Sequence, residues 1–490
     1  MNMLSWLEEN IGRRYGNFID GEWQDAGANA VPIHNPARKE QVLGYFAESS
    51  ADEVNLAVEA AHRAWKSWRE VPGPDRGAIL FRAADILERR VDDIAFALSA
   101  EQGKILAEAR GEVMRAAKEL RFCAGEASRI DGDTLPSEKR NGLAMTLREP
   151  VGVIAAIAPW NFPVVTPVRK IGPALAYGCT VVFKPSNFTP WSAAKLMDVF
   201  AEAGLPKGVV NLVLGTGRTA GEAMTRHPLV RGVSFTGSTK TGSEINAQVA
   251  RRFVRTQLEL GGKNPVIVFA DADIEAALPV LVNAIIQNGG QTCSAGSRVL
   301  IERPVYEKVA SALAGRFSKL VAGPHDADLD LGPLINEKQR DRVAGMVAAA
   351  KEAGVSVLAE GSVHADAPKG GYYQPPVLFG SVDPAAVVAQ EEVFGPVLTL
   401  FPFEGEEEAV RLANSTEFGL VASVWTKDGA RQHRVAKRVR AGQVFVNGYG
   451  AGGGIELPFG GFKKSGHGRE KGFEALYDMS ATKTVVFNHQ

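Results

Sequence analysis

Short apolar segments alternate with helix-like segments in the second quarter of the chain, and this order constrains the fold more than any other feature. Strand-like runs occupy residues 151–157, 180–184, 209–214 and 232–235, with helical patterns between them. This order predicts a parallel, doubly wound α/β sheet with right-handed crossovers. Ligands of such sheets bind outside the carboxyl ends of the strands, where Pro, Gly, Ser and Lys residues collect in this sequence. The pattern therefore indicates a nucleotide site.

Two glycine-containing turns lie at these strand ends. The cluster at residues 215–221 has the spacing G-x-G-x-x-x-G, which differs from the usual dinucleotide fingerprint, and no acidic residue follows at the expected distance. By itself this cluster is a weak indication. Gly237 and Ser238 at a second strand-to-helix turn strengthen it, because a helix N-terminus presents free N–H groups to a phosphate. Lys184 adds a cation at a strand tip, although an ordinary solvated lysine is the alternative.

The first third of the chain is predicted to be mostly helical after a short β-rich entry. Residues 17–23 predict a hairpin around an Asp-Gly turn. A Ser-x-x-Glu capping box at residues 50–53 opens a helix that runs to about Trp65. Apolar residues at helical spacing predict two further helices, over residues 76–98 and 107–125.

Composition narrows the classes of function. The chain has 490 residues, 45% hydrophobic and 23% charged, which is ordinary for a globular protein of two or three domains. A formal net charge of -1 gives no indication of nucleic acid or an anionic membrane as partner. Three cysteines argue against a disulfide framework and for a reducing compartment. Residues 1–16 lack the apolar core of a signal peptide, and no apolar run is long enough to span a bilayer. We expect a soluble, cytoplasmic protein.

The chemistry is expected at residues 288–298. An apolar helix-like run over residues 276–286 stops at a glycine pair, and Cys293 follows. The glycines allow a sharp turn, and small neighbours leave room beside the thiol. A cysteine in this position acts as a nucleophile provided that its thiolate is made available. Taken alone, a small buried hydrophobic residue is the more common role of a cysteine.

The second half of the chain predicts another α/β unit. It starts after residues 259–263, and strand-like segments continue from 265–269 to 443–447. A glycine-rich loop over residues 448–454 follows. The last apolar segment, residues 482–487, has no evident partner, so it pairs either with another subunit or within its own chain.

Seven short motifs then point to a family. The chain resembles the aldehyde dehydrogenases, and the resemblance covers nearly its whole length. Each motif is weak alone, but their occurrence in the family order argues strongly against a chance match. The motifs are PWNFP at 159–163, KPS at 184–186, FTGST at 235–239, ELGGK at 259–263, GQTC at 290–293, EVFGP at 392–396 and PFGG at 458–461.

The resemblance implies a fold, a division into domains and an assembly. A Rossmann-like doubly wound cofactor domain would comprise residues 1–136 and 151–260, and an α/β catalytic domain residues 261–470. Residues 137–150 and 471–490 would form a small bridging sheet in a homodimer or homotetramer.

The resemblance also implies a mechanism. Cys293 attacks the aldehyde carbon, while the Asn161 amide and the Cys293 backbone N–H stabilise the oxyanion. The loss of such a donor typically costs about a hundredfold to a thousandfold in rate. After hydride transfer, Glu259 activates the water that hydrolyses the thioester. Lys170 and Glu470 match family positions that assist proton transfer, with surface ion pairing as the alternative. No metal is implied.

The implied cofactor is NAD or NADP. Many members that prefer NAD carry Glu where this chain has Asn187, and a carboxylate there would repel a 2′-phosphate. The neutral Asn187 therefore predicts that NADP is accepted. The positions assigned to the cofactor by the resemblance are Ala158, Pro159, Trp160, Lys184, Ser186, Asn187, Gly217, Phe235, Gly237, Ser238, Leu260, Glu392 and Phe394.

The aldehyde itself is less constrained. Arg169 matches a carboxylate-binding arginine of relatives that act on succinate semialdehyde, whereas Gln287 replaces the second such arginine. Tyr449 lies in the glycine-rich loop, whose lack of bulk either leaves room for a large or ring-bearing aldehyde or serves backbone geometry. Three other functions stay open. The first is a CoA-acylating semialdehyde dehydrogenase, though such relatives tend to lack the base that Glu259 supplies. The second is a cysteine hydrolase, for which no histidine pairing pattern is present, and the third is a non-enzymatic structural or binding protein.

Overall fold

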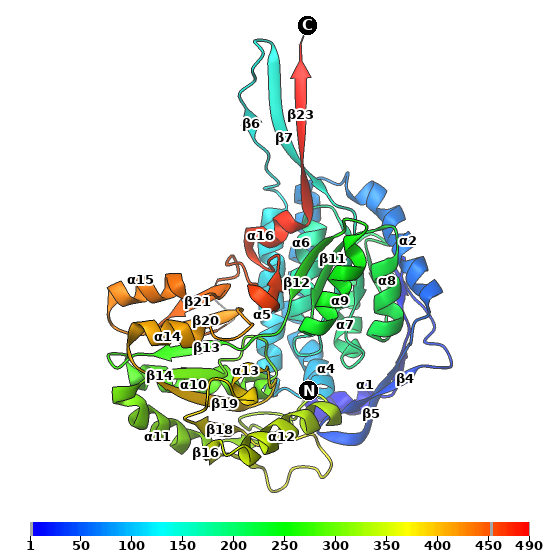
Figure 1. The fold of residues 1–490 in the computed structure, drawn as a ribbon. Helices are drawn as coiled ribbons and strands as arrows, with labels where there is room; N and C mark the ends of the chain where they lie inside the picture. The colour runs from blue at the N-terminus through cyan, green and yellow to red at the C-terminus, as the bar shows by residue number, and fades with distance from the viewer. Residues whose placement is uncertain (1–2, 451–453, 490) are drawn as a thin grey trace.

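A computed structural model describes residues 3–450 and 454–489 of the chain. Figure 1 shows two α/β bodies and an arm of long strands that projects beyond them. One body is built on an eight-stranded sheet and the other on a seven-stranded sheet. The predicted α/β class with a doubly wound sheet is confirmed.

The eight-stranded sheet has a parallel centre of five strands. A hairpin closes one edge, as residues 17–23 predict, and a two-residue antiparallel strand closes the other. The order across the sheet is β22 (Gly466–His467), β12 (Arg255–Glu259), β11 (Val230–Thr236), β8 (Val153–Ile157), β9 (Thr180–Lys184), β10 (Val210–Leu212), β2 (Phe18–Ile19) and β3 (Glu22–Trp23).

Helices cover both faces of this sheet, because successive side chains of its strands point to opposite sides. In β8, Val153 and Ala155 join one hydrophobic core, and Ile154 and Ala156 join the other. The crossover helices are α6 (Val165–Ala176), α7 (Pro190–Glu202), α8 (Glu222–Arg226) and α9 (Thr239–Ala250). A π-helical turn, Gly217–Gly221, joins the glycine cluster to α8.

The N-terminal helices differ from the prediction at one point. The capping box is present, with Ser50 accepting from the Glu53 N–H, and opens α2 (Ala51–Trp68). The single helix predicted over residues 76–98 is wrong, because the helix breaks at Arg90, whose ψ is 21°. The other elements here are α1 (Met3–Asn10), α3 (Gly73–Arg89), α4 (Val91–Gln102), α5 (Leu106–Glu126), and a small sheet of β1 (Arg13–Tyr15), β4 (Val31–Asn35) and β5 (Arg38–Phe46).

The seven-stranded sheet is parallel except for β16 at one edge. Its order is β16 (Ser356–Glu360), β18 (Val377–Gly380), β19 (Val397–Phe403), β14 (Arg298–Glu302), β13 (Pro265–Val268), β20 (Val421–Trp425) and β21 (Gln443–Val446). A two-stranded ladder joins β15 (Val321–Ala322) to β17 (Ser362–Val363). The helices of this body are α10 (Ile274–Ile286), α11 (Tyr306–Phe317), α12 (Glu337–Glu352), α13 (Val387–Gln390), α14 (Gly405–Ala413) and α15 (Gly429–Arg438). The last helix, α16 (Gly472–Asp478), packs instead against α6 and β23.

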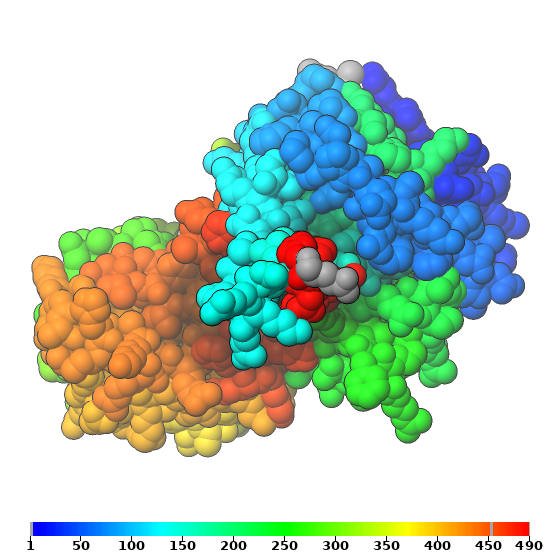
Figure 2. All heavy atoms as spheres, turned by 90° about the horizontal axis from the view of Figure 1, so that it is seen from above, coloured from blue at the N-terminus to red at the C-terminus, as the bar shows by residue number. Residues whose placement is uncertain are grey.

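The arm is a three-stranded antiparallel sheet. The last strand, β23 (Ser480–Asn488), pairs along its length with β7 (Gly142–Pro150), and β6 (Thr134–Leu135) lies on the other side of β7. The terminal strand therefore pairs within its own chain. Figure 2, which looks down on the arm, shows it rising between the two bodies. Within residues 3–450 and 454–489, no helix has the length and apolar character needed to cross a bilayer.

Candidate active site

Cys293 lies in a loop between α10 and β14. The 3-10 turn Gln287–Gly290 ends α10, and Asn288 and Gly289 adopt left-handed backbone angles there. Gly290 has a φ of 72°, and a Cβ at this position would lie 2.2 Å from the Gly395 backbone. Only glycine permits this approach between the cysteine loop and the EVFGP segment. The structure thus explains the glycine pair that the sequence places before the cysteine.

Asn264 fixes the cysteine loop by hydrogen bonds to its backbone. Its side-chain amide donates to the carbonyls of Cys293 and Ala295, each at 2.8 Å, and its oxygen accepts from the Val421 N–H at 2.9 Å. A Cβ at Gly262 would lie 2.3 Å from the Cys293 carbonyl, so this position also requires glycine. The sequence analysis missed Asn264, although it directly follows the ELGGK motif.

The predicted oxyanion donor, Asn161, reaches the same loop. Its buried amide donates to the Gln291 carbonyl at 2.9 Å. Its own carbonyl accepts from the Lys104 ammonium and from the Asn288 amide, each at 2.8 Å. Glu112 forms a buried ion pair with Lys104 at 2.6 Å. Backbone and side chain of Asn161 are therefore both fixed beside the cysteine loop.

Glu259 stands at the carboxyl end of β12 with 1% of its surface exposed. Within the described residues, neither of its carboxylate oxygens has a hydrogen-bond partner. Burial raises the pKa of Glu259 well above its usual range, and the nearby Glu470 adds to the effect. A buried, unpaired carboxylate of raised pKa is suited to accept a proton.

Lys170 and Glu470 form a buried ion pair beside this carboxylate. The Lys170 ammonium lies 2.5 Å from Glu470 and 2.6 Å from the Thr236 hydroxyl, which itself donates to Glu470 at 2.8 Å. Both charged side chains are at most 1% exposed. The alternative of surface ion pairing is therefore wrong.

The Cys293 thiol sits among carboxylates. Burial, with smaller contributions from Glu392 and Glu259, raises its pKa to about 12, while Arg169 opposes the shift. Without substrate or cofactor the thiol is therefore protonated at neutral pH. Reaction requires a change of environment or a base that removes this proton.

A cavity of about 520 Å³ opens at the carboxyl ends of the central strands, between α8 and α9. Its lining includes the predicted residues Lys184, Gly217 and Phe235, together with Arg218 and Arg226. Ser238 caps α9 by accepting from the Thr241 N–H, so the helix N-terminus faces the same edge of the sheet. The lining also contains Glu222, which pairs with Arg226, and Glu244. A cavity with Lys184, Arg218 and a helix N-terminus beside it fits a phosphate-bearing dinucleotide.

Several other predicted cofactor residues lie between the cofactor cavity and the cysteine loop. Glu392 accepts from the Gly262 N–H at 2.9 Å, and burial raises its pKa to about 7. The rings of Trp160 and Phe394 meet edge to face at 5.3 Å. The Ala158 N–H donates to the Lys184 carbonyl at 3.1 Å. Asn187 is exposed and does not line the cavity between α8 and α9.

The predicted substrate residues divide into two groups. Gln287 and Tyr449 line one small cavity of about 40 Å³ with Thr292 and Ser294. Arg169 lies elsewhere, paired with Glu119 at 3.2 Å. Of the glycine-rich loop, residues 451–453 lie outside the described residues, so the hypothesis of a roomy loop stays a prediction.

Comparison with known proteins decides the identity. Residues 23–485 match the model of the aldehyde dehydrogenase family. The chain belongs to this family. It is 40% identical to the alpha-ketoglutaric semialdehyde dehydrogenase of Bacillus subtilis over 96% of this chain and 97% of that protein. It is also 40% identical to an NADP(+) succinate-semialdehyde dehydrogenase of Escherichia coli, covering 94% and 95% of the two chains.

A solved structure agrees. The NAD+ complex of an aldehyde dehydrogenase from Bacillus cereus superposes with a TM-score of 0.94 at 37% identity, covering 99% of this dehydrogenase and 98% of that chain. The chain is thus an enzyme that oxidises an aldehyde to the carboxylic acid with NAD or NADP as hydride acceptor. The prediction of family, activity and cofactor class is confirmed.

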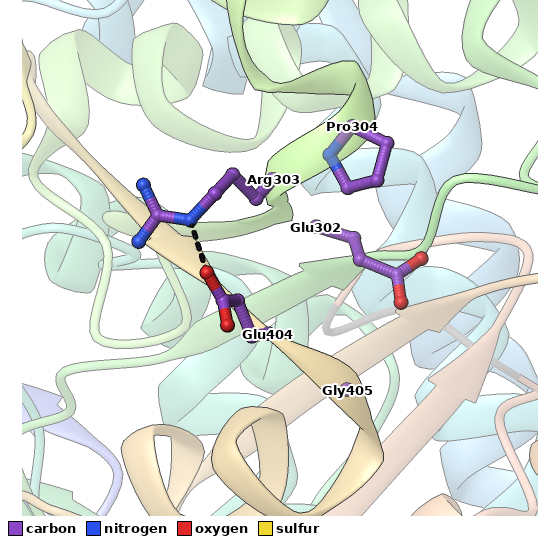
Figure 3. Close-up of a pocket in the computed structure, with 5 residues that line it drawn as sticks. All are labelled: Glu302, Arg303, Pro304, Glu404 and Gly405. Carbon is purple, nitrogen blue, oxygen red and sulfur yellow. Dashed lines mark hydrogen bonds and ion pairs between the residues drawn. The ribbon is translucent and has the colours of Figure 1, made fainter.

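One further cavity of the dehydrogenase lies outside this site. Figure 3 shows five residues around a space of about 450 Å³ at the ends of β14 and β19: Glu302, Arg303, Pro304, Glu404 and Gly405. Arg303 and Glu404 pair across it at 2.7 Å, and both side chains are exposed. None of the predicted site residues lines this cavity, and an exposed pair of this kind contributes little to stability.

Proposed function

We propose that the enzyme oxidises an aldehyde that carries a terminal carboxylate, with Cys293 as nucleophile and Glu259 as the base for hydrolysis. The observation that carries the mechanism is the buried carboxylate of Glu259 without a hydrogen-bond partner, whose field reaches the Cys293 thiol. Relatives named for semialdehydes support the substrate class.

The residues divide the reaction between them. Glu259 takes the thiol proton, and the Cys293 thiolate forms a bond to the aldehyde carbon. The Asn161 amide and the Cys293 N–H donate to the resulting oxyanion. Bound NAD or NADP supplies the hydride acceptor, and the residues at the strand ends around Lys184 and Glu392 hold it. Glu259 then releases the thiol proton to solvent water. The ionised carboxylate next takes a proton from the water whose oxygen bonds to the acyl carbon, the bond to the Cys293 sulfur breaks, and the acid is released with the thiolate regenerated.

The arrangement of the site fits hydrolysis of a thioester better than acyl transfer to CoA or cleavage of a peptide. A buried carboxylate beside the thiol serves water activation, which a CoA-acylating enzyme does not need. His325 bonds Ser99 and His467 bonds Thr256, so both histidines are engaged away from Cys293. A requirement for CoA in turnover would contradict the proposal.

A group of cations supports recognition of a carboxylate. Arg115, Arg169 and Lys471 interact with one another, and the carboxylate of Glu119 lies among them. Glu119 lies 3.2 Å from Arg169 and 3.9 Å from Arg115. Three cations near the carboxylates of Glu119 and Glu456 leave a net positive charge. In the proposal they serve the role of the arginine that Gln287 replaces, from a different position.

Neutralising Arg115 should weaken the binding only of those aldehydes that carry a terminal carboxylate. For Arg115→Gln we expect KM for succinate semialdehyde to rise about tenfold to hundredfold, because a hydrogen bond to a charged group is worth about 1.5–3 kcal/mol. KM for the uncharged aldehyde butanal should change less than about twofold. Arg110→Gln, on the same helix but exposed and paired with Asp92, is the control. Equal effects on both aldehydes would contradict carboxylate recognition.

The cofactor preference follows from Asn187 and the two arginines of the large cavity. We infer that NADP is accepted, because neutral Asn187 does not repel a 2′-phosphate and Arg218 and Arg226 offer positive charge. Asn187→Glu should lower kcat/KM for NADP about tenfold or more relative to NAD. Asn141→Glu adds the same charge on the arm and should not change the ratio. Refusal of NADP by the parent enzyme would contradict the inference.

We also propose a cytoplasmic homodimer or homotetramer assembled through the arm. Leu143, Leu147 and Val486 are exposed on the arm, as expected of a surface that a second subunit covers. All three cysteines are free, which suits a reducing compartment. The domain limits at residues 136, 151, 260 and 470 stay part of this proposal.

A further inference from the structure

A chain of hydrogen bonds leads from the Lys170–Glu470 pair beside the active site toward the opposite end of the strands. The Lys170 ammonium, which bonds Glu470, also donates to the Ser234 hydroxyl at 3.2 Å. Ser234 in turn donates to the Gln257 side-chain oxygen at 2.5 Å. The Gln257 amide reaches Asp478 at 3.4 Å. These polar groups form a continuous path through an otherwise apolar core.

Strand geometry puts the path on one face of the sheet. Thr236 is paired with Glu259 across β11 and β12, and two residues earlier Ser234 is paired with Gln257. Because side chains alternate with a period of two, Ser234 and Thr236 point to the same side, where Lys170 lies on α6. The path therefore runs back along the strands, away from the end at which the cofactor cavity opens.

The path ends at a separate cavity of about 250 Å³. Ser234, Gln257 and Asp478 line it, together with Arg255 and Thr256. Its size admits several water molecules, and its polar lining offers them partners. It shares no lining residue with the cofactor cavity or with the small cavity beside Tyr449.

The proposed chemistry needs such an outlet. Each hydrolysis leaves a water proton on Glu259, and this carboxyl group has 1% of its surface exposed. With the dinucleotide on one side and the acid product on the other, both cavities near Cys293 are occupied when the proton must leave.

We propose that this third cavity is the exit for that proton, with the Ser234 hydroxyl as the relay between Lys170 and cavity water. The inference rests on the proposed role of Glu259. Glu259, whose oxygens have no hydrogen-bond partner among the described residues, passes its proton through an intervening water molecule to Glu470. Lys170 gives one proton to Ser234, and the Ser234 hydroxyl turns from Gln257 to release its own proton to cavity water. Each group then regains a proton from its inner neighbour, so only one proton crosses and no group changes its net charge.

Ser234 is suited to this role, whereas Gln257 is not. A hydroxyl group can accept from the Lys170 ammonium while it donates to water, but an amide has no proton that it readily gives up. Gln257 instead orients the hydroxyl. Ser234 is thus a positioning and relay residue that acts through Lys170.

The matched pair Ser234→Thr and Ser234→Val tests the relay, because the two side chains have the same shape and only threonine keeps the hydroxyl. Both are β-branched and suit a strand, and the cavity leaves room for the added methyl group. Ser234→Ala, which introduces no bulk, is the second variant without a hydroxyl.

Stopped-flow measurement should separate the steps in holoenzyme supplied with NADP and succinate semialdehyde. In Ser234→Val and Ser234→Ala, we expect the first turnover of reduced cofactor at the parent rate within about twofold. The following steady rate, and proton release reported by an indicator dye, should fall at least about fivefold. Ser234→Thr should restore both.

Steady turnover and proton release at the parent rate in both hydroxyl-free variants would overturn the proposal. So would equal slowing in Ser234→Thr and Ser234→Val, since the cause would then be packing. A wrong role for Glu259 would give a different result from a wrong role for Ser234. If Glu259 is not the base, Glu259→Gln should turn over at the same steady rate as the parent enzyme.

Discussion

Replacement of Cys293 by alanine is expected to abolish aldehyde oxidation, with kcat/KM lowered by about 10⁴-fold or more. Without the sulfur no covalent adduct forms, so neither hydride transfer nor thioester hydrolysis can begin. Loss of reduced-cofactor formation with succinate semialdehyde and NADP measures the effect. Binding of NADP, followed by fluorescence titration, should persist because the cofactor cavity does not include Cys293.

Cys123→Ala is the matched control for this substitution. Cys123 is a buried thiol on α5 that packs against Gly172, so it is remote from the reaction chemistry and should keep most activity. Retention of more than about one-hundredth of the parent activity by Cys293→Ala would contradict nucleophilic catalysis by this residue.

The raised pKa of Cys293 adds a consequence for the free enzyme. A thiol with a pKa of about 12 holds very little thiolate at neutral pH. Alkylation of Cys293 by iodoacetamide should therefore be slow at pH 7 and accelerate with each rise in pH, beyond the range in which an ordinary cysteine levels off near 8.5. The charge of Glu259 acts on this thiol, in keeping with its proposed role as the base that removes the thiol proton during turnover.

The alternation of strands and helices in the cofactor-binding half was predictable from the sequence for a physical reason. Parallel strands buried on both faces are continuous apolar runs, and Gly and Pro mark their ends. The strand over residues 180–184 was predicted with the bounds that the structure has. Asn161 follows β8 and Glu259 ends β12, so the eight-stranded sheet brings both to one edge. Cys293 instead lies in the loop between α10 and β14.

The groups that hold these residues were not predictable in the same way. Lys104, Glu112 and Asn264 act through tertiary contacts whose partners lie far away in the sequence. Ser234 reads as a small polar residue in a buried strand, and only the placement of α6 gives it a lysine neighbour. The break at Arg90 has neither Gly nor Pro to signal it. Local patterns carry no information about such partners.

Replacement of Glu259 by glutamine should separate the two halves of the reaction. Glutamine keeps the shape of the side chain but cannot accept a proton from water. We expect at most one turnover of reduced cofactor per subunit, itself slower than in the parent because Glu259 also takes the thiol proton, followed by turnover slowed about 10²- to 10⁴-fold. Intact-protein mass spectrometry should then detect the acyl group on Cys293, because its hydrolysis has lost the base.

The rate of thioester hydrolysis should also depend on pH, in the direction set by the ionisation of Glu259. A general base acts in its ionised form, and burial raises the pKa of Glu259 well above 4.5. The hydrolysis rate of the parent enzyme should therefore rise with pH as Glu259 loses its proton, and this rise should be absent in Glu259→Gln. Glu404→Gln, at the exposed pair beside the cavity of Figure 3, removes one carboxylate far from the thiol and should match the parent.

The two outcomes of this experiment exclude different mechanisms. An acyl-enzyme that accumulates in Glu259→Gln and disappears on addition of CoA would make this carboxylate dispensable for transfer and place the enzyme with the acylating dehydrogenases. An acyl-enzyme that forms slowly, with no burst, would mean that Glu259 is needed to generate the thiolate. Because the Cys293 thiol has a pKa of about 12, a partial loss of burst rate together with blocked hydrolysis would assign both proton transfers to Glu259.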